Sequence, residues 1–281
     1  MNGVLPAIEH GVSNSHTTTR SLLSYIMLHG VRFANVTEAQ CVDFVMREID
    51  TGRGGWIMTP NLDILRMLAS DRVIQDLTSE VDMFVADGMP LIWASRLQGT
   101  PLPERVCGSN LIYSLSEAAA QHGRSIFLLG GDPGTAEGAA DLLRKQSPAL
   151  KIAGSHCPPM GFQDDPVEMK RITDLLEASA PDIIFVALGC PKQEQLIDQL
   201  RAVIPSAWWL GIGISFSYAT GDLKRAPKWL QRIGLEWVYR LVQDPRRMFS
   251  RYIIHDIPFA IKLFSRSFVR RFSRSPQNEV G

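Results

Sequence analysis

The segment "SIFLLGGDPGTAEGAADLLRKQSPALKIAGSH", residues 125–156, has the pattern of a strand, a glycine turn, a helix and a second strand. Its apolar runs, 125–131 and 151–156, flank a helix-like stretch over 133–147 that we expect Pro133 to open. Strands joined by a helix of this length run parallel in one sheet, with the helix packed on a face. The segment therefore predicts two parallel strands and a covering helix.

The same alternation extends in both directions along the chain. Further strands are expected at 31–36, 56–58, 82–86, 182–189 and 207–214, and helices at 37–50, 62–70, 90–98, 109–123, 166–179 and 192–204. The fold class is α/β, with a Rossmann-like, mainly parallel sheet and helices on both faces. Ligands of such folds bind beyond the carboxyl ends of the strands.

The alternation stops near residue 222, where the charge also changes. Residues 224–274 hold thirteen Lys and Arg against three acids, a net charge of +10, and the rest of the chain carries −10. Helix-like segments continue there, and we expect Pro245 and Pro258 to cut them. We predict a disordered lead-in over 1–25, an α/β core over 26–222, a basic amphipathic appendage over 223–274 and a disordered tail over 275–281.

The appendage interleaves arginine with aromatic and aliphatic residues, which is typical of a helix lying on an anionic membrane. Nucleic acid is the competing partner for such a sequence, and a purely structural helix pair is the third interpretation. The isoleucine and phenylalanine density over 253–269 favours the membrane and argues against nucleic acid. No run of about 18 apolar residues occurs, so a spanning helix is not expected.

The remaining composition indicates an intracellular protein, and its residue spacings offer no metal site. Four scattered cysteines form no CxxC pair, which suits a reducing compartment. The N-terminus lacks a signal-peptide pattern, so we expect a cytoplasmic protein peripherally associated with the inner face of the plasma membrane. The six histidines form no HxxxH or HxH pattern and no Asp-x-Asp occurs, so neither a metal nor a cofactor is expected.

Asp87 is the first candidate for chemistry, because the strand over 82–86 delivers it to the ligand-binding edge of the sheet. Gly88 allows close approach of a substrate, although an Asp-Gly pair is also ordinary turn chemistry and Asp87 could simply cap the next helix. Arg105 lies in a proline-bracketed loop after that helix. It could hold this loop through Glu104 or face a phosphate.

Three further loops end strands at the same edge. Thr59 and Asn61 could contact a sugar or cap a helix. The glycines at a strand-to-helix turn could hold a phosphate, or they could serve only packing. The first turn of another helix could also hold a phosphate, or it could simply be solvated. The residues of these two turns are Gly130 and Gly131, followed by Gly189, Pro191, Lys192, Gln193 and Glu194.

Taken together, these loops resemble the WecG/TagA/CpsF family of bacterial glycosyltransferases over residues 30–250. The motifs that carry the resemblance, in order along the chain, are "TPN" (59–61), "ADG" (86–88), "PLPERVCGSNL" (101–111), "LLGG" (128–131), "VALGCPKQE" (186–194), "GDLKRAP" (221–227) and "GLEWVYRL" (234–241).

The resemblance implies an inverting, metal-independent enzyme of cell-surface polysaccharide or exopolysaccharide synthesis. It would move a hexose-type sugar (glucose, N-acetylmannosamine or its uronic acid) from a UDP-sugar to a saccharide on polyprenyl diphosphate. Asp87 would be the catalytic base, with Thr59, Asn61 and Gln193 at the substrates. The appendage would close over the site and bring arginines near the diphosphates, namely Arg225, Arg232 and Arg240. A homo-oligomer or the bilayer could be needed for this closure, and the sequence leaves both open.

Two hypotheses from other classes compete. A nicotinamide-dependent oxidoreductase would use the glycine turn after residue 129, although the turn is no clean GxGxxG and no acid ends the next strand. A non-catalytic membrane adaptor would use the appendage as an anchor and the core as a scaffold.

Overall fold

The computed structural model of the protein describes residues 23–273, so most of the predicted lead-in and all of the predicted tail over 275–281 lie outside the described residues. An eight-stranded sheet in the order β1-β2-β4-β3-β8-β7-β5-β6 forms its centre. β1 and β2 pair antiparallel, and all the remaining neighbouring strands pair parallel. The predicted α/β, Rossmann-like class is confirmed. The strands are β1 Tyr25–Leu28, β2 Val31–Ala34, β3 Gly55–Met58, β4 Met83–Phe84, β5 Ser125–Gly130, β6 Lys151–His156, β7 Ile183–Ala187 and β8 Trp208–Gly211.

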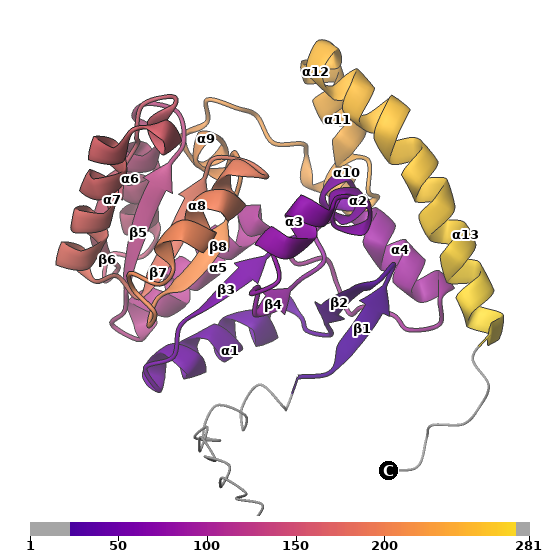
Figure 1. The fold of residues 1–281 in the computed structure, drawn as a ribbon, viewed down its shortest axis with the longest axis horizontal. Helices are drawn as coiled ribbons and strands as arrows, with labels where there is room; N and C mark the ends of the chain where they lie inside the picture. Colours follow the sequence, from indigo (N-terminus) through magenta and orange to yellow (C-terminus); the bar gives the residue numbers. More distant parts are fainter. Residues whose placement is uncertain (1–22, 274–281) are drawn as a thin grey trace, which may run out of the picture.

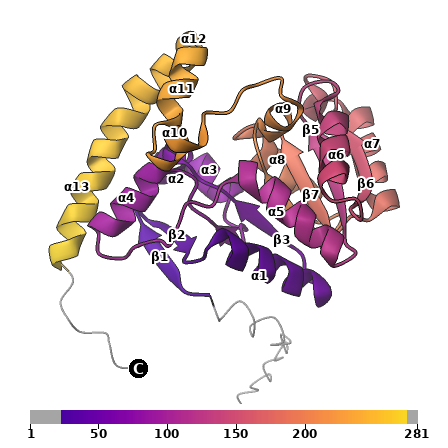
Figure 2. The same ribbon diagram turned by 180° about the vertical axis from the view of Figure 1, so that it is seen from behind.

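Helices cover both faces of the sheet (Figures 1 and 2). One face carries α1 (Glu38–Asp50), α5 (Gly108–Gln121), α6 (Thr135–Gln146) and α9 (Ser215–Thr220). The other carries α2 (Leu62–Ser70), α3 (Arg72–Leu77), α7 (Pro166–Ser179) and α8 (Lys192–Leu200). Consecutive side chains of a strand point to opposite faces, and so Trp208 packs under α1 while its neighbour Trp209 packs under α8. Both tryptophans are 1% exposed, and burial of such large apolar surfaces is the main stabilising contribution to the core.

Local signals explain where most elements begin. The sequence did not predict β1, α3 or α9, and it misplaced the start of α6. Thr37 forms the predicted capping box with Gln40 at the start of α1. β1 begins at Tyr25, inside the predicted lead-in, because it pairs with β2 through a two-residue turn. Pro133 does not open α6, because the left-handed Gly134 is the capping residue and the proline stays in the preceding turn. β8 ends at Gly211, three residues before the predicted end at residue 214, and the short helix α9 that follows it was not predicted.

The appendage is helical, as predicted, but Pro258 does not cut it. It consists of α10 (Lys228–Arg232), α11 (Glu236–Gln243), α12 (Pro245–Phe249), the π-helical η3 (Ser250–Asp256) and α13 (Ile257–Ser273). Pro258 is the second residue of α13, where its ring would crowd a regular preceding turn. The wider π-helical turns of η3 come just before it, so the last three elements form one continuous run (Figure 1).

α13 packs along α4 (Met89–Leu97) at one end of the sheet (Figure 1). Phe259 and Leu263 of α13 share a buried apolar cluster with Leu91 and Ile92 of α4. Between residues 23 and 273, none of the helices combines the length and the apolar character needed to cross a bilayer.

Candidate active site

A cavity of about 290 Å³ opens beyond the carboxyl ends of β3 and β4, between the core and the appendage. This is the edge at which parallel sheets bind ligands. The core contributes the loop after each of these two strands, the start of α4 and the loop before α5. The appendage contributes α11, η3 and α13. The lining residues used below are Asn61, Asp63, Asp87, Gly88, Met89, Pro90, Trp93, Arg105, Arg225, Gly234, Glu236, Trp237, Arg240, Arg251, Tyr252, Asp256, Ile257, Ala260 and Phe264.

Asp87 lies at the end of the strand-exit loop after β4. Its backbone N–H donates to the carbonyl oxygen of Pro60 at 2.9 Å, which joins this loop to the one after β3. Gly88 follows with φ +137°, a conformation that favours glycine, and it precedes the first residue of α4. No donor among residues 23–273 hydrogen-bonds the Asp87 carboxylate. Its oxygens are therefore free to accept a proton from a ligand.

The pKa of Asp87 is raised to about 6, first by burial and then by the charge of Glu236. Arg105, Arg240 and Arg225 oppose this shift by favouring the carboxylate. Desolvation disfavours the charged form of an acid, while nearby cations favour it. Asp87 is thus a carboxylate near neutral pH that still holds a proton more tightly than an ordinary aspartate.

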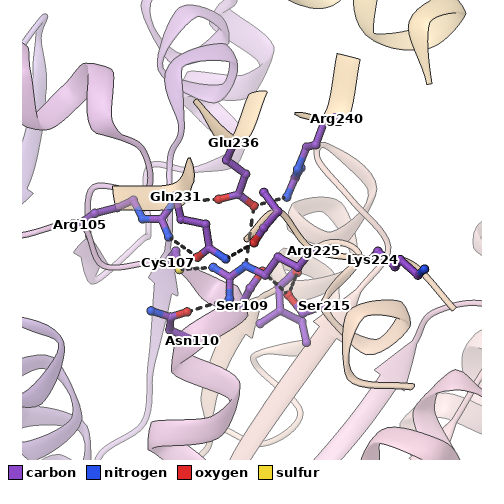
Figure 3. Close-up of polar contacts among 12 residues, drawn as sticks. Arg105, Cys107, Ser109, Asn110, Ser215, Lys224, Arg225, Gln231, Glu236 and Arg240 are labelled. Carbon is purple, nitrogen blue, oxygen red and sulfur yellow. Dashed lines mark hydrogen bonds and ion pairs between the residues drawn. The ribbon is translucent and has the colours of Figure 1, made fainter. Parts of the chain in front are cut away.

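Glu236 of α11 gathers three arginines at the polar end of the cavity (Figure 3). Arg105 Nη1 donates to Glu236 Oε2 at 3.0 Å. Arg225 Nε and Arg240 Nη2 lie 3.7 and 3.5 Å from Glu236 Oε1. Burial opposes ionisation of Glu236, but the arginines outweigh it and lower its pKa. Three guanidinium groups against the two carboxylates of Glu236 and Asp87 leave a positive charge, which suits an anionic ligand.

A second layer of contacts holds these arginines in place (Figure 3). Arg225 Nη1 donates to Asn110 Oδ1 at 2.9 Å, and Arg105 Nη2 donates to Gln231 Oε1 at 3.4 Å. Gln231 in turn donates to the carbonyl oxygen of Ala226 at 2.6 Å. Arg225 of the appendage is thereby held against the first turn of α5, and Arg105 of the core is held against Gln231 of α10.

The other end of the cavity is apolar. Met89, Pro90 and Trp93 of α4 face Ile257, Ala260 and Phe264 of α13 across it. The cavity therefore combines a cationic end beside one free carboxylate with an apolar end between two helices.

An ion-pair cluster ties the appendage to α2 beside this cavity. Arg251 Nε lies 2.9 Å from Asp63 Oδ2, and Arg66 lies 3.7 Å from Asp256 Oδ1. Burial and the charge of Asp63 raise the pKa of Asp256 to about 6. Among residues 23–273, no group of three or more His, Cys, Asp or Glu side chains could hold a metal ion.

The sequence matches the glycosyl transferase WecG/TagA/CpsF family over residues 26–273. The chain belongs to this family. Two relatives are named N-acetylglucosaminyldiphosphoundecaprenol N-acetyl-beta-D-mannosaminyltransferase. The one from Bacillus subtilis (strain 168) is 32% identical over 222 residues, which cover 78% of this chain and 84% of the relative. The one from Bacillus spizizenii is 34% identical over 206 residues, which cover 72% and 77%.

The structure of this glycosyltransferase brings six of the predicted site residues to the cavity. They are Asn61, Asp87, Gly88, Arg105, Arg225 and Arg240. Asn61 fits both interpretations of its loop, because it lines the cavity and also caps α2 by accepting from the N–H of Ile64 at 3.1 Å. Glu104 does not hold Arg105. Its carboxylate instead accepts from the backbone N–H of Glu38 at 2.6 Å, and Arg105 donates to Glu236.

The other predicted site residues lie outside this cavity. Gln193 is 5% exposed and accepts from the backbone N–H of Gly213, so its amide stabilises the loop after β8. Thr59 is buried, whereas Arg232 and Lys192 are exposed on α10 and α8. Gly130, Gly131, Gly189, Pro191 and Glu194 also lie outside the cavity wall. The roles of these nine residues in the glycosyltransferase stay predictions.

Several cavity residues of the glycosyltransferase were missed. Glu236 belongs to the "GLEWVYRL" motif and is one of the three acids in the basic segment 224–274. An acid among many arginines is a signal for an ion-pair centre, and that signal could have been used. Asp256 carries the same signal, since it is another acid of the basic segment. Asp63 does not, because its partner Arg251 comes from an element far apart in sequence.

Proposed function

We propose that this glycosyltransferase is an inverting enzyme that moves a sugar from a UDP-sugar to a saccharide carried on polyprenyl diphosphate. One observation carries the proposal: a free carboxylate, Asp87, shares a cavity with three arginines and an apolar wall. A lipid-linked sugar diphosphate has three parts in sequence. Its sugar hydroxyl needs a base, its diphosphate needs a cationic site, and its lipid needs an apolar surface. The names of both relatives specify such an acceptor, N-acetylglucosaminyldiphosphoundecaprenol.

Asp87 is the base in the proposed mechanism. A hydroxyl of the acceptor sugar transfers its proton to the Asp87 carboxylate while its oxygen bonds to the anomeric carbon of the donor. The bond from that carbon to the UDP oxygen breaks on the opposite side, and UDP leaves with the electron pair. One carboxylate suffices for this displacement, and a pKa near 6 keeps it ionised at neutral pH and basic enough to accept a proton.

Arg105, Arg225 and Arg240 bind diphosphate in this proposal. Charge-assisted hydrogen bonds from guanidinium groups suit phosphate oxygens, and Glu236 keeps the three groups together until the ligand arrives. Cations fixed in advance stabilise charge on a leaving diphosphate without a reorganisation cost. The proposal therefore assigns to the arginines the task that a metal ion performs in other transferases.

The apolar wall between α4 and α13 would take the first isoprene units of the acceptor. Beyond it, the appendage exposes apolar side chains at helical spacing, including Ile254, Ile261, Phe268 and Phe272, which are 52–71% exposed. With the basic residues of the same segment, this pattern suits a helix that lies on an anionic membrane. We place the enzyme peripherally at the cytoplasmic face of the membrane.

N-acetylmannosamine is the first donor to test, because both relatives are named for transfer of this sugar. Their β product would form with inversion from an α-linked sugar nucleotide. Glucose and N-acetylmannosaminuronic acid are the other candidates. Membership in a glycosyl transferase family favours sugar transfer over the oxidoreductase and adaptor hypotheses.

The test is a product screen by mass spectrometry. Purified full-length protein, anionic vesicles and a short-chain polyprenyl-diphosphate N-acetylglucosamine acceptor would be incubated with each UDP-sugar. We expect one donor to add a single sugar to the acceptor, in EDTA as well as in magnesium. Absence of any product across the panel would contradict the substrate assignment, and a rate that EDTA abolishes and magnesium restores would contradict metal independence.

A further inference from the structure

A second cavity, of about 160 Å³, lies between the β1–β2 turn and the C-terminal half of α13. It is separate from the cavity that holds Asp87, since the two share no lining residue. Its walls are His29, Gly30, Gln98, Leu263, Arg266, Ser267 and Arg270. Most of these side chains are polar or cationic, and neither the family nor the proposed transfer reaction accounts for them.

Cationic groups dominate this second cavity. Arg266 and Arg270 are one turn apart on α13 and so lie on the same side of it. Neither pairs with a carboxylate anywhere in the described part of the chain, 23–273. The charged groups that act on His29 are Arg266, Lys262 and Arg270, all cations. The cavity therefore carries positive charge that no carboxylate of residues 23–273 pairs with.

His29 offers a hydrogen-bond donor that has no acceptor. Arg266 Nη1 lies 3.3 Å from His29 Nε2, and a guanidinium group can only donate. His29 Nε2 must therefore accept, which places the ring proton on Nδ1. That Nδ1 atom is buried and has no hydrogen-bond partner among the described residues 23–273. A buried N–H without an acceptor is costly, and it favours a ligand that brings one.

The backbone holds His29 in an unusual place for a histidine. His29 and Gly30 have φ angles of +49° and +90° and form the two-residue turn between Leu28 and Val31. Asparagine and glycine are the residues that such turns prefer. Phe259 packs edge-on against the ring at 4.9 Å and fixes its orientation. Histidine is among the few non-glycine residues that adopt such a left-handed position readily, and here it also orients its ring at the cavity.

We propose that this second cavity binds a phosphate group, with Arg266, Arg270 and the Nδ1–H of His29 as its donors. The shared chemistry is a tetrahedral oxyanion, which soluble phosphate or the headgroup of an anionic phospholipid could supply. Guanidinium pairs and an imidazole N–H are suitable donors for such an anion. The site does not depend on the sugar-transfer reaction, because it stands on different residues.

The pKa of His29 gives the site a direct readout. Burial and the three cations lower it to about 4. A bound phosphate would offset these cations, so the imidazole should become easier to protonate and its NMR signals should move. The signals of His29 therefore report binding at this cavity and not at the arginines near Asp87.

The experiment titrates inorganic phosphate into full-length protein at constant ionic strength while the His29 ring signals are followed by NMR. The test variant is R266Q/R270Q. The control is R246Q/R271Q, which removes the same charge from exposed arginines of the appendage outside the cavity. We expect the wild type and the control to bind alike and the test variant to bind at least about tenfold more weakly. H29N, which keeps a residue suited to the turn, should also weaken phosphate binding, measured by isothermal titration calorimetry because this variant has no His29 ring signals.

A second arm identifies the source of the phosphate. Flotation would compare vesicles of phosphatidylglycerol in phosphatidylcholine with vesicles of phosphatidylcholine alone. If R266Q/R270Q loses more binding to the anionic vesicles than R246Q/R271Q, the headgroup is the ligand. If both variants lose equally while phosphate still distinguishes them, the ligand is a soluble phosphate. The proposal is overturned if phosphate leaves the His29 signals of the wild type unmoved, or if the control weakens phosphate binding as much as the test variant.

Discussion

Arg105 in the core and Glu236 in the appendage join the two parts of the protein through a hydrogen bond of 3.0 Å. The two side chains are each 15% exposed, so water screens their attraction weakly. Glu236 also compensates Arg225 and Arg240. This carboxylate is therefore the point at which closure of the appendage and assembly of the cationic site are coupled.

Glu236→Gln should weaken both the closure of the appendage and the assembly of the cationic site. Three arginines would lose their common counter-charge, and removal of one partner from a buried ion pair costs about 3–5 kcal/mol of stability. We expect faster proteolysis of the appendage and a transfer rate that falls more than its substrate affinity does. Chemical denaturation and limited proteolysis check the first effect. Glu177→Gln, an exposed acid on α7, is the matched control, and equal behaviour of the two variants would contradict the role of Glu236.

Asp87→Asn should separate activity from stability. Loss of the base should reduce transfer by about 10²–10⁴-fold. Because the pKa of Asp87 is about 6 in the folded protein and near 4 when unfolded, folding holds its proton more tightly. Its ionisation therefore destabilises the fold increasingly as the pH rises through about 6. The asparagine variant should be more stable than the wild type by about 1–3 kcal/mol at about pH 8, and this gain should vanish near pH 4.

Denaturant unfolding at both pH values measures this difference. Asp43→Asn, on the exposed side of α1, controls for the loss of a negative charge. If Asp87→Asn changes the stability equally at both pH values, burial does not raise the pKa of Asp87 in the folded protein.

The acid limb of the pH–rate profile should report the same group. The base must be ionised to accept a proton, so kcat/KM should rise with pH and reach half its plateau near the Asp87 pKa of about 6. A bound diphosphate adds negative charge beside Asp87, which should shift the limb of kcat to higher pH. Initial rates across this range check both expectations. A profile that stays flat between about pH 5 and 8 would remove Asp87 from the rate-limiting proton transfer.

The sequence predicted the core because its signals are local. Apolar runs set the strands, and Thr37 with Gln40 set the start of α1. The strand-exit rule also placed Asp87 and Asn61 at one edge, and both line the cavity. Gln193 followed the same rule yet turned inward to bond Gly213, since an exit loop can aim a side chain at the core as readily as at a ligand.

The appendage was harder to predict because its contacts are long-range. Its positive charge suggested a surface for membranes. Part of that charge is instead compensated, because Arg225 and Arg240 pair with Glu236 and Arg251 pairs with Asp63. Pairings across 131 residues, as between Arg105 and Glu236, leave no periodic pattern in the sequence. β1 was missed for a related reason, since a four-residue edge strand depends on its partner β2.

Gly234→Ala should release the appendage from α4. Gly234 joins α10 to α11 with φ +75°, and a Cβ atom there would lie 2.6 Å from Trp93 Cη2 and 2.8 Å from Met89 Cβ. Alanine would therefore add both backbone strain and a clash with two residues of the cavity wall. Gly221→Ala is the matched control, because its φ of +83° imposes the same strain while nothing lies within 4 Å of the added Cβ.

The control should lose about 1–2 kcal/mol of stability, which is the cost of a left-handed alanine, and keep most of its transfer activity. Gly234→Ala should lose more stability than the control and most of its activity, since α11 carries Glu236 and Arg240 into the cavity. Thermal unfolding and the transfer assay, run on both variants, measure the difference. Equal losses in the two variants would mean that close packing of the appendage on α4 contributes nothing beyond the strain of the turn.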